Sequence, residues 1–375
     1  MAQQHLDPPT NPTAGPTGDA LAGYLRAQAT EFLRSLRQHR ETGAGGPSAH
    51  GGPPARARSR VGEESHAGGP GTDGSGDAAL ALRRSARRIS GTLHTFRPLL
   101  DADWSEAMRP ELAWLSGTLA REHAYAARLE RLLLALHRLS GSSVFPAPTG
   151  GAGEAGTGPR SQPGVPERGN LTVGAAKAGA LLERQLTLAR TRAHSAALQA
   201  LGSSRFHAVA DSVAVLASEV PLTAAAATAD LRPLAAAAEE RLCDAVAALP
   251  LVTAGHPYNA EALIHGLSPD PAPHPQDGPW HQVRLLLRLH RYAREVLYGE
   301  DVPVDVRLLA AGQALNRHRD ASEAAAAAAA AARTPRIAPA TAYALGVLHA
   351  DQRHEVEAAR FAFQQSWQKQ AVGTP

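Results

Sequence analysis

Residues 79–96, ALALRRSARRISGTLHTF, decide the fold because their order builds a helix with two unlike faces. An α-helix turns by roughly 100° per residue, and at that step the large apolar side chains gather on one side. They are Leu82, Ile89, Leu93 and Phe96. The cationic and protonatable side chains gather on the other side, and we name them the first arginine stripe: Arg83, Arg84, Arg87, Arg88 and His94. The apolar side is predicted to dock on a core, which leaves the stripe accessible.

A second stretch, residues 280–297 (WHQVRLLLRLHRYAREVL), repeats this arrangement. One face carries four cationic or protonatable side chains, which we name the second arginine stripe: His281, Arg284, Arg288 and Arg291. The leucines and Val296 are predicted to occupy the opposite side. Like charges at positions i and i+4 oppose helix formation slightly, so each stripe requires solvent, acidic partners or a bound anion.

The pattern of the two stripes leaves two interpretations open. Guanidinium groups bind phosphate oxygens bidentately and stay protonated at neutral pH, so a row of them suits a linear polyanion. Arginines on helices also pair with the carboxylates of neighbouring helices. Periodicity alone does not choose between these interpretations.

The rest of the chain is typical of an all-α protein. Hydrophobic residues make up 43% of its 375 residues but aromatic residues only 4%, and this excess of alanine and leucine favours helices over sheets. Residues 19–40 read as a further amphipathic helix, and no segment alternates like a strand. We therefore predict an all-α fold of two helical bundles joined by linkers rich in glycine and proline.

Composition also gives the domain limits. The first bundle is predicted over 18–140 and contains a disordered insertion at 41–77, where Gly, Pro and Ser are too frequent to bury a core. A flexible linker at 141–170 separates it from a second bundle over 171–370. The nine alanines at 324–332 form either a soluble helix or a disordered linker.

The charge balance and the number of cysteines indicate the cellular compartment that the protein occupies. The chain carries 38 Lys and Arg against 35 Asp and Glu, with only two lysines, so its cations are almost all arginines. A single cysteine, Cys243, excludes an intramolecular disulfide and favours a reducing compartment. The N-terminal residues lack a signal-peptide pattern, and no uncharged apolar run reaches the about 18 residues of a membrane span. We expect a cytoplasmic protein with no membrane partner.

Enzyme and metal motifs are absent. A P-loop of the form GxxxxGK[ST] cannot occur, because Lys177 and Lys369 lie in unrelated contexts. The sequence has no GxSxG nucleophile elbow and no HExxH zinc motif. We therefore nominate no catalytic residue, no metal ligand and no cofactor, and predict a protein that is not an enzyme.

Both arginine stretches resemble the signature helices of the CHAD domain, a histidine-bearing α-helical domain associated with inorganic polyphosphate. Residues 79–104 resemble the first signature, and 280–297 resemble the second, with Tyr292 matching as well. The resemblance implies two bundles related by a pseudo-twofold axis, with polyphosphate in a basic channel between them. It implies a binding role for seven residues: Arg83, Arg87, Arg88, His281, Arg284, Arg288 and Arg291. Arg84 and His94 rest on the stripe pattern alone. Expected partners are polyphosphate granules or a polyphosphate-metabolising enzyme.

The sequence departs from the CHAD signatures at three positions. Leu80 stands where the first signature has its histidine, and Ser90 and Leu289 replace cations. Two alternatives to polyphosphate binding therefore remain. The first is a nucleic-acid-binding helical protein, because phosphate contacts are generic. The second is a degenerate CHAD scaffold whose stripes are neutralised by its own carboxylates.

Overall fold

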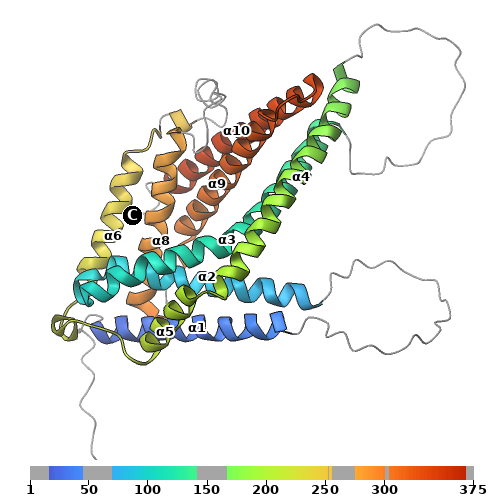
Figure 1. The fold of residues 1–375 in the computed structure, drawn as a ribbon. Coiled ribbons are helices and arrows are strands. Elements are labelled where there is room, and N and C mark those ends of the chain that lie inside the picture. The colour runs from blue at the N-terminus through green and yellow to red at the C-terminus, as the bar shows by residue number, and fades with distance from the viewer. Residues whose placement is uncertain are drawn as a thin grey trace, which may run out of the picture. The chain divides into compact units, whose positions relative to one another are not determined.

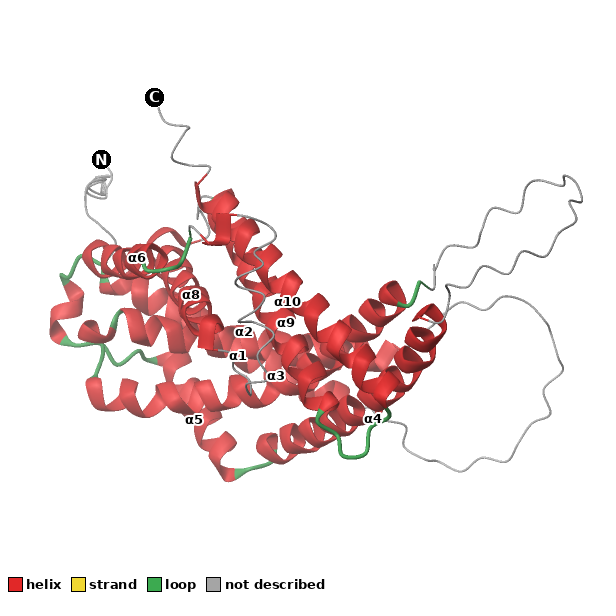
Figure 2. Ribbon diagram, turned by 90° about the horizontal axis from the view of Figure 1, so that it is seen from above, coloured by secondary structure: helices red, strands yellow, loops and turns green. Residues whose placement is uncertain are grey.

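The computed structural model describes most of the chain as helix (Figures 1 and 2). The described residues are 17–44, 70–141, 167–251, 253–255, 275–299 and 304–368. No strand occurs among them, and one isolated backbone bridge joins Leu100 to Leu222. The predicted all-α fold is confirmed.

Nine long helices are described, together with short 3-10 turns. The helices are α1 (Gly18–Ala44), α2 (Pro70–Thr95), α3 (Ala102–Leu139), α4 (Glu167–Leu201), α5 (Ser204–Ser218), α6 (Arg232–Ala247), α8 (Gly278–Tyr298), α9 (Val306–Ala332) and α10 (Pro339–Gln368). The turns are η1 (Arg97–Leu99), η2 (Ala224–Ala227), η3 (Thr253–Gly255) and η4 (Pro275–Asp277).

Helices α1 and α2 continue into the predicted insertion at 41–77. Residues 41–44 and 70–77 are helical, and 45–69 lie outside the described residues. In the same way α4 begins at Glu167, inside the linker predicted at 141–170, and residues 142–166 lie outside the described part.

The chain divides into two compact units, each assembled from segments that are far apart in sequence. Unit 1 comprises 1–120, 197–240 and 288–302, and unit 2 comprises 121–196, 241–287 and 303–375. Helices α3, α4, α6 and α8 each contribute residues to both units. The bundles predicted at 18–140 and 171–370 follow composition, whereas these units follow helix packing. The predicted bundle limits stay a prediction.

Unit 1 is built around the apolar faces of α1, α2 and α5. Helices α1 and α2 run side by side, and α5 packs on α1 (Figure 1). Phe32 of α1 and Phe206 of α5 are fully buried in this core. The four apolar residues predicted for the helix over 79–96 are buried as well, three of them on α2 and Phe96 directly after it: Leu82, Ile89, Leu93 and Phe96. The predicted orientation of α2, with its apolar face on the core, is confirmed.

Unit 2 depends on close packing between small residues. Helix α9 continues through the nine alanines, and α10 runs alongside it (Figure 1). Ala324, Ala328 and Ala331 are fully buried against residues such as Leu345 and Leu348 of α10. The polyalanine stretch is therefore a core helix, and of the two predicted alternatives the linker is wrong.

Gly174 marks a close contact between α4 and the start of α10. A Cβ atom built on Gly174 would lie 2.2 Å from the carbonyl oxygen of Ala340. We expect Gly174→Ala to lower the free energy of unfolding by about 1 to 3 kcal/mol, because backbone must move to admit the methyl group. Urea denaturation of the purified protein measures this change.

The matched control for this substitution is Gly346→Ala in α10. A Cβ atom on Gly346 would meet nothing within 4 Å. Alanine has the higher helix propensity, so this variant should gain up to about 1 kcal/mol. Equal effects at the two glycines would contradict the close contact at Gly174.

Candidate functional site

The first arginine stripe lies on α2 in unit 1, opposite the buried apolar face. Arg84 is exposed, and Arg83 and Arg87 are half-buried. The Nε atom of Arg87 donates a hydrogen bond of 2.9 Å to the hydroxyl of Ser116 on α3. His94 is exposed at the end of α2, where its Nδ1 atom lies 3.0 Å from the guanidinium of Arg109.

Arg88, also in the first arginine stripe, is paired with a carboxylate of α8. Its Nε atom donates to Oε2 of Glu295 at 2.7 Å, and its Nη2 atom donates to Oε1 at 3.3 Å. The phenol of Tyr24 on α1 donates to the same Oε2 atom at 2.7 Å. Burial and the charge of Glu295 raise the pKa of Tyr24 well above its usual range, so its proton stays in place. Three helices therefore meet at one ion pair.

Helices α2 and α8 touch directly beside this ion pair. The guanidinium carbon of Arg88 lies 5.9 Å from the centroid of the Tyr292 ring. A Cβ atom on Gly91 would lie 2.6 Å from Cδ2 of Tyr292, so only glycine admits the ring at this distance. In unit 1 the structure thus brings the helices that carry the two stripes into contact.

The second arginine stripe is divided between the units, because α8 passes from one to the other. Arg288 and Arg291 belong to unit 1, where Arg288 is half-buried and Arg291 exposed. His281 and Arg284 belong to unit 2 and are half-buried. The Nη1 atom of Arg284 donates to Oδ1 of Asn316 on α9 at 3.4 Å.

His281 is a weak base in this setting. Burial lowers the pKa of its imidazole, and Arg284 lowers it further, while Asp277 opposes both effects. The ring packs edge-on against His318 of α9, with 5.6 Å between the centroids. At neutral pH the imidazole of His281 is therefore mostly uncharged.

The apolar face of α8 is largely as predicted. Val283, Leu286, Leu287 and Leu289 are buried. Leu285 is 42% exposed, so the prediction that all the leucines face the core is wrong at this position. Leu285 follows Arg284 by about 100° around the helix, which places it at the edge of the polar face.

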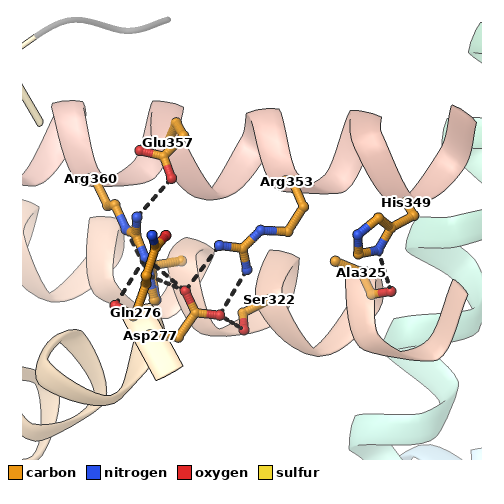
Figure 3. Close-up of polar contacts among 9 residues, drawn as sticks. Gln276, Asp277, Ser322, Ala325, His349, Arg353, Glu357 and Arg360 are labelled. Carbon is orange, nitrogen blue, oxygen red and sulfur yellow. Dashed lines mark hydrogen bonds and ion pairs between the residues drawn. The ribbon is translucent and has the colours of Figure 1, made fainter. Parts of the chain in front are cut away.

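A buried network of charges, which was not predicted from the sequence, lies at the start of α8 (Figure 3). Asp277, in η4, is fully buried. Its Oδ2 atom accepts a 2.8 Å hydrogen bond from Nη1 of Arg353, and its Oδ1 atom accepts one of 2.7 Å from Nη2 of Arg360. The hydroxyl of Ser322 on α9 also donates to Oδ2. Arg360 donates in turn to Glu357 at 2.7 Å, so α10 supplies two cations and one carboxylate.

The charges of this network balance when His318 is neutral. Burial lowers the pKa of His318 to about 4, and its Nε2 atom accepts a 3.3 Å hydrogen bond from Nε of Arg360. Burial alone would raise the pKa of Asp277, but the charge of Arg353 and the hydrogen bond that Arg353 donates oppose burial, and that pKa lies well below its usual range. Two arginines thus face two carboxylates inside unit 2, directly before the turn of α8 that carries His281.

A signal for this network exists in residues 353–364. Arg353, Glu357 and Arg360 follow one another at spacings of four and three residues, alongside the buried Val356 and Phe363. Charged residues at core positions of an amphipathic helix require buried partners. Those partners lie far away in the sequence, and helical periodicity does not identify them.

The described part of the chain contains neither a membrane-spanning helix nor a cluster of metal ligands. None of its helices combines the length and apolar character needed to cross a membrane. Within the same residues, no three His, Cys, Asp or Glu side chains are grouped so that they could hold a metal ion.

Comparisons with known proteins agree on one family. The family model described as CHAD domain matches residues 70–329, a range that contains all nine residues predicted for the site. Among solved structures, PptA from Streptomyces chartreusis is 68% identical, and the comparison covers 94% of this chain and 99% of that chain with a TM-score of 0.71. No curated protein matches the sequence.

Proposed function

The chain belongs to the CHAD domain family, and on this premise we propose that it binds inorganic polyphosphate and catalyses no reaction. The observation that carries the proposal is the orientation of the two arginine helices. Both α2 and α8 bury an apolar face and turn arginines away from it, at successive helical turns. Because α2 and α8 touch within unit 1, the arginines of α2 and the α8 residues Arg288 and Arg291 belong to one region of that unit.

Six arginines are the proposed phosphate ligands. They are the arginines of the two stripes other than the ion-paired Arg88, and as residues each is exposed or half-buried: Arg83, Arg84, Arg87, Arg284, Arg288 and Arg291. Each guanidinium has a planar fork of donors that matches two phosphate oxygens. A chain of linked phosphates offers such oxygens at regular intervals, as the stripes offer forks. His94 and His281 serve as hydrogen-bonding groups at the edges of the stripes.

The proposal extends to the setting in which binding takes place. Family membership favours a cytoplasmic protein that sits on polyphosphate granules or works beside a polyphosphate-metabolising enzyme. The six proposed ligands are all arginines, which bind anions but are poor general acids or bases because they remain protonated. The non-enzymatic part of the proposal rests on this chemistry.

A competition titration tests the proposed ligand. Labelled long-chain polyphosphate is titrated with the protein at physiological salt, and double-stranded DNA and single-stranded RNA are added at equal phosphate concentration. We expect polyphosphate to bind and neither nucleic acid to displace it. Displacement would instead identify a nucleic-acid-binding protein. Absence of any binding would support the other alternative, a degenerate CHAD scaffold that binds no anion.

The salt dependence of the same titration tests the mechanism. If about six phosphates are neutralised, the logarithm of the affinity should fall with the logarithm of salt concentration at a slope of roughly −4. Counterions released from the polyphosphate produce this slope, so it reports the number of cation–phosphate contacts. A flat dependence would contradict binding through arginines.

A further inference from the structure

The ion pair between Arg88 and Glu295 has the geometry of a bound anion. Both carboxylate oxygens of Glu295 accept from the guanidinium, at 2.7 and 3.3 Å. A guanidinium binds a phosphate group through the same two-point fork. In this structure a side chain of the protein therefore occupies the place that a phosphate would take on Arg88.

The surroundings hold this pair in place. Tyr24 donates its hydroxyl to Glu295 from α1, and the Tyr292 ring lies beside the guanidinium, packed against Gly91. The Arg88 side chain keeps 31% of its surface exposed and that of Glu295 only 19%. A phosphate that captured Arg88 would leave Glu295, which is the more buried partner, without its counter-ion. The intramolecular pair is thus favoured over a phosphate contact.

Arg88 and Arg84 differ in their settings on the same helix. Arg84 is exposed, whereas Arg88 is half-buried and is bound by a carboxylate through two hydrogen bonds. Arg87, one position before Arg88, donates from Nε to the neutral hydroxyl of Ser116. Arg88 is therefore a cation of the first arginine stripe whose charge is matched by a carboxylate of the protein.

We propose that Glu295 is a specificity-determining residue, an internal carboxylate that keeps Arg88 out of phosphate contact and limits how tightly the α2 face binds polyphosphate. This inference rests on the proposed function, and it revises the role that the CHAD resemblance implies for Arg88. Arg88 is then a positioning residue that ties α2 to α8, and α2 offers Arg83, Arg84 and Arg87 to the ligand.

The test compares two glutamates that hold arginines in the same way. Glu295→Gln should bind polyphosphate about tenfold more tightly than the natural protein, because Arg88 becomes a further phosphate ligand. Its salt slope should steepen by about 0.7. The control is Glu111→Gln, since Glu111 is also held by two guanidinium nitrogens, those of Arg205 at 2.6 and 3.0 Å in unit 1. This control makes the same change in net charge on α3, at a carboxylate that pairs with α5 and not with an arginine of either stripe, and it should leave the slope unchanged.

Substitutions of Arg88 complete the double-mutant cycle with Glu295. Arg88→Gln should leave polyphosphate affinity within about twofold of the natural protein, and Arg88→Gln combined with Glu295→Gln should abolish the gain of the single Glu295 variant. The proposal is overturned if Arg88→Gln weakens binding as much as Arg87→Gln does. Equal gains from Glu295→Gln and Glu111→Gln would overturn it too, because net charge alone would then explain them.

A stability cycle tests the ion-pair cluster without any polyphosphate. Tyr24→Phe, Glu295→Gln and the double variant are unfolded in urea, and their losses of stability should be non-additive, because the two residues share one hydrogen bond. Additive losses would show that Tyr24 and Glu295 do not share this hydrogen bond, which would contradict the ion-pair cluster around Glu295. If the natural protein fails to bind polyphosphate, the proposed function fails, while this cycle still reports whether Glu295 is engaged as the structure shows.

Discussion

Replacing Arg284 and Arg288 together by glutamate should reduce polyphosphate affinity by roughly a hundredfold or more. Each arginine would lose a charge-assisted hydrogen bond to phosphate worth about 1.5 to 3 kcal/mol, and each glutamate would add repulsion. The helix should persist, because α8 is held by the opposite face, where Val283 and Leu287 are buried. Titration with labelled polyphosphate measures the affinity, and circular dichroism measures the helix content.

The matched control for this charge reversal uses two exposed arginines on other helices. Arg26 of α1 and Arg241 of α6 are exposed, and they lie in unit 1 and unit 2 respectively. Arg26→Glu combined with Arg241→Glu changes the net charge by the same amount and should weaken binding far less. Equal losses in the two double variants would show that only net charge matters. Loss of helix content in the α8 variant would show that its arginines serve the fold.

The orientation of the two arginine helices could be predicted from the sequence because it depends on neighbours along the same helix. Leu82 and Leu93 lie eleven residues apart, which is close to three full turns, so local periodicity places them on one face. Leu285 shows the limit of this reasoning. A residue at the border between faces is buried only if another helix covers it, and the pattern within α8 does not contain that information.

The partners of the arginines could not be predicted, because they come from distant parts of the chain. Arg88 and Glu295 are separated by 207 positions, and Tyr24 lies on a third helix. The sequence pattern of the stripes is compatible both with anion binding and with pairing to carboxylates. The structure gives different answers within one stripe: Arg88 pairs with a carboxylate, whereas Arg84 is exposed. Whether phosphate occupies the rest of the stripe stays a prediction.

The division into units was also beyond the reach of composition. Linkers rich in glycine and proline show where a chain is unlikely to be helical, but they do not show which helices pack together. Helix α8 illustrates the difference, since Leu287 belongs to unit 2 and the next residue, Arg288, to unit 1. Residues of one continuous helix thus belong to two units. A domain boundary placed between helices does not match this division.

Asp277→Asn should lower the free energy of unfolding by about 3 to 5 kcal/mol, because it removes a buried charge and leaves its partners. Arg353 and Arg360 would both lose this carboxylate, and Arg360 would keep its ion pair with the buried Glu357. Urea denaturation at neutral pH measures the loss. Asp230→Asn is the control, since Asp230 pairs with Arg232 at the surface and its loss should matter little. Similar losses for the two variants would contradict a buried role for Asp277.

The effect of Asp277→Asn should also depend on pH, in a direction fixed by linkage. Arg353 helps to hold the pKa of Asp277 below its usual range, so ionised Asp277 stabilises the folded chain at any pH above the unfolded-state pKa of about 3.9. Below that pH the unfolded chain takes up a proton that the folded chain resists, and the contribution shrinks as the pH falls towards the folded-state pKa. The stability difference between the natural protein and Asp277→Asn should therefore be constant near neutrality and decrease in acid. A difference that stays constant down to pH values well below about 3.9 would show that shape, and not charge, is what Asp277 contributes.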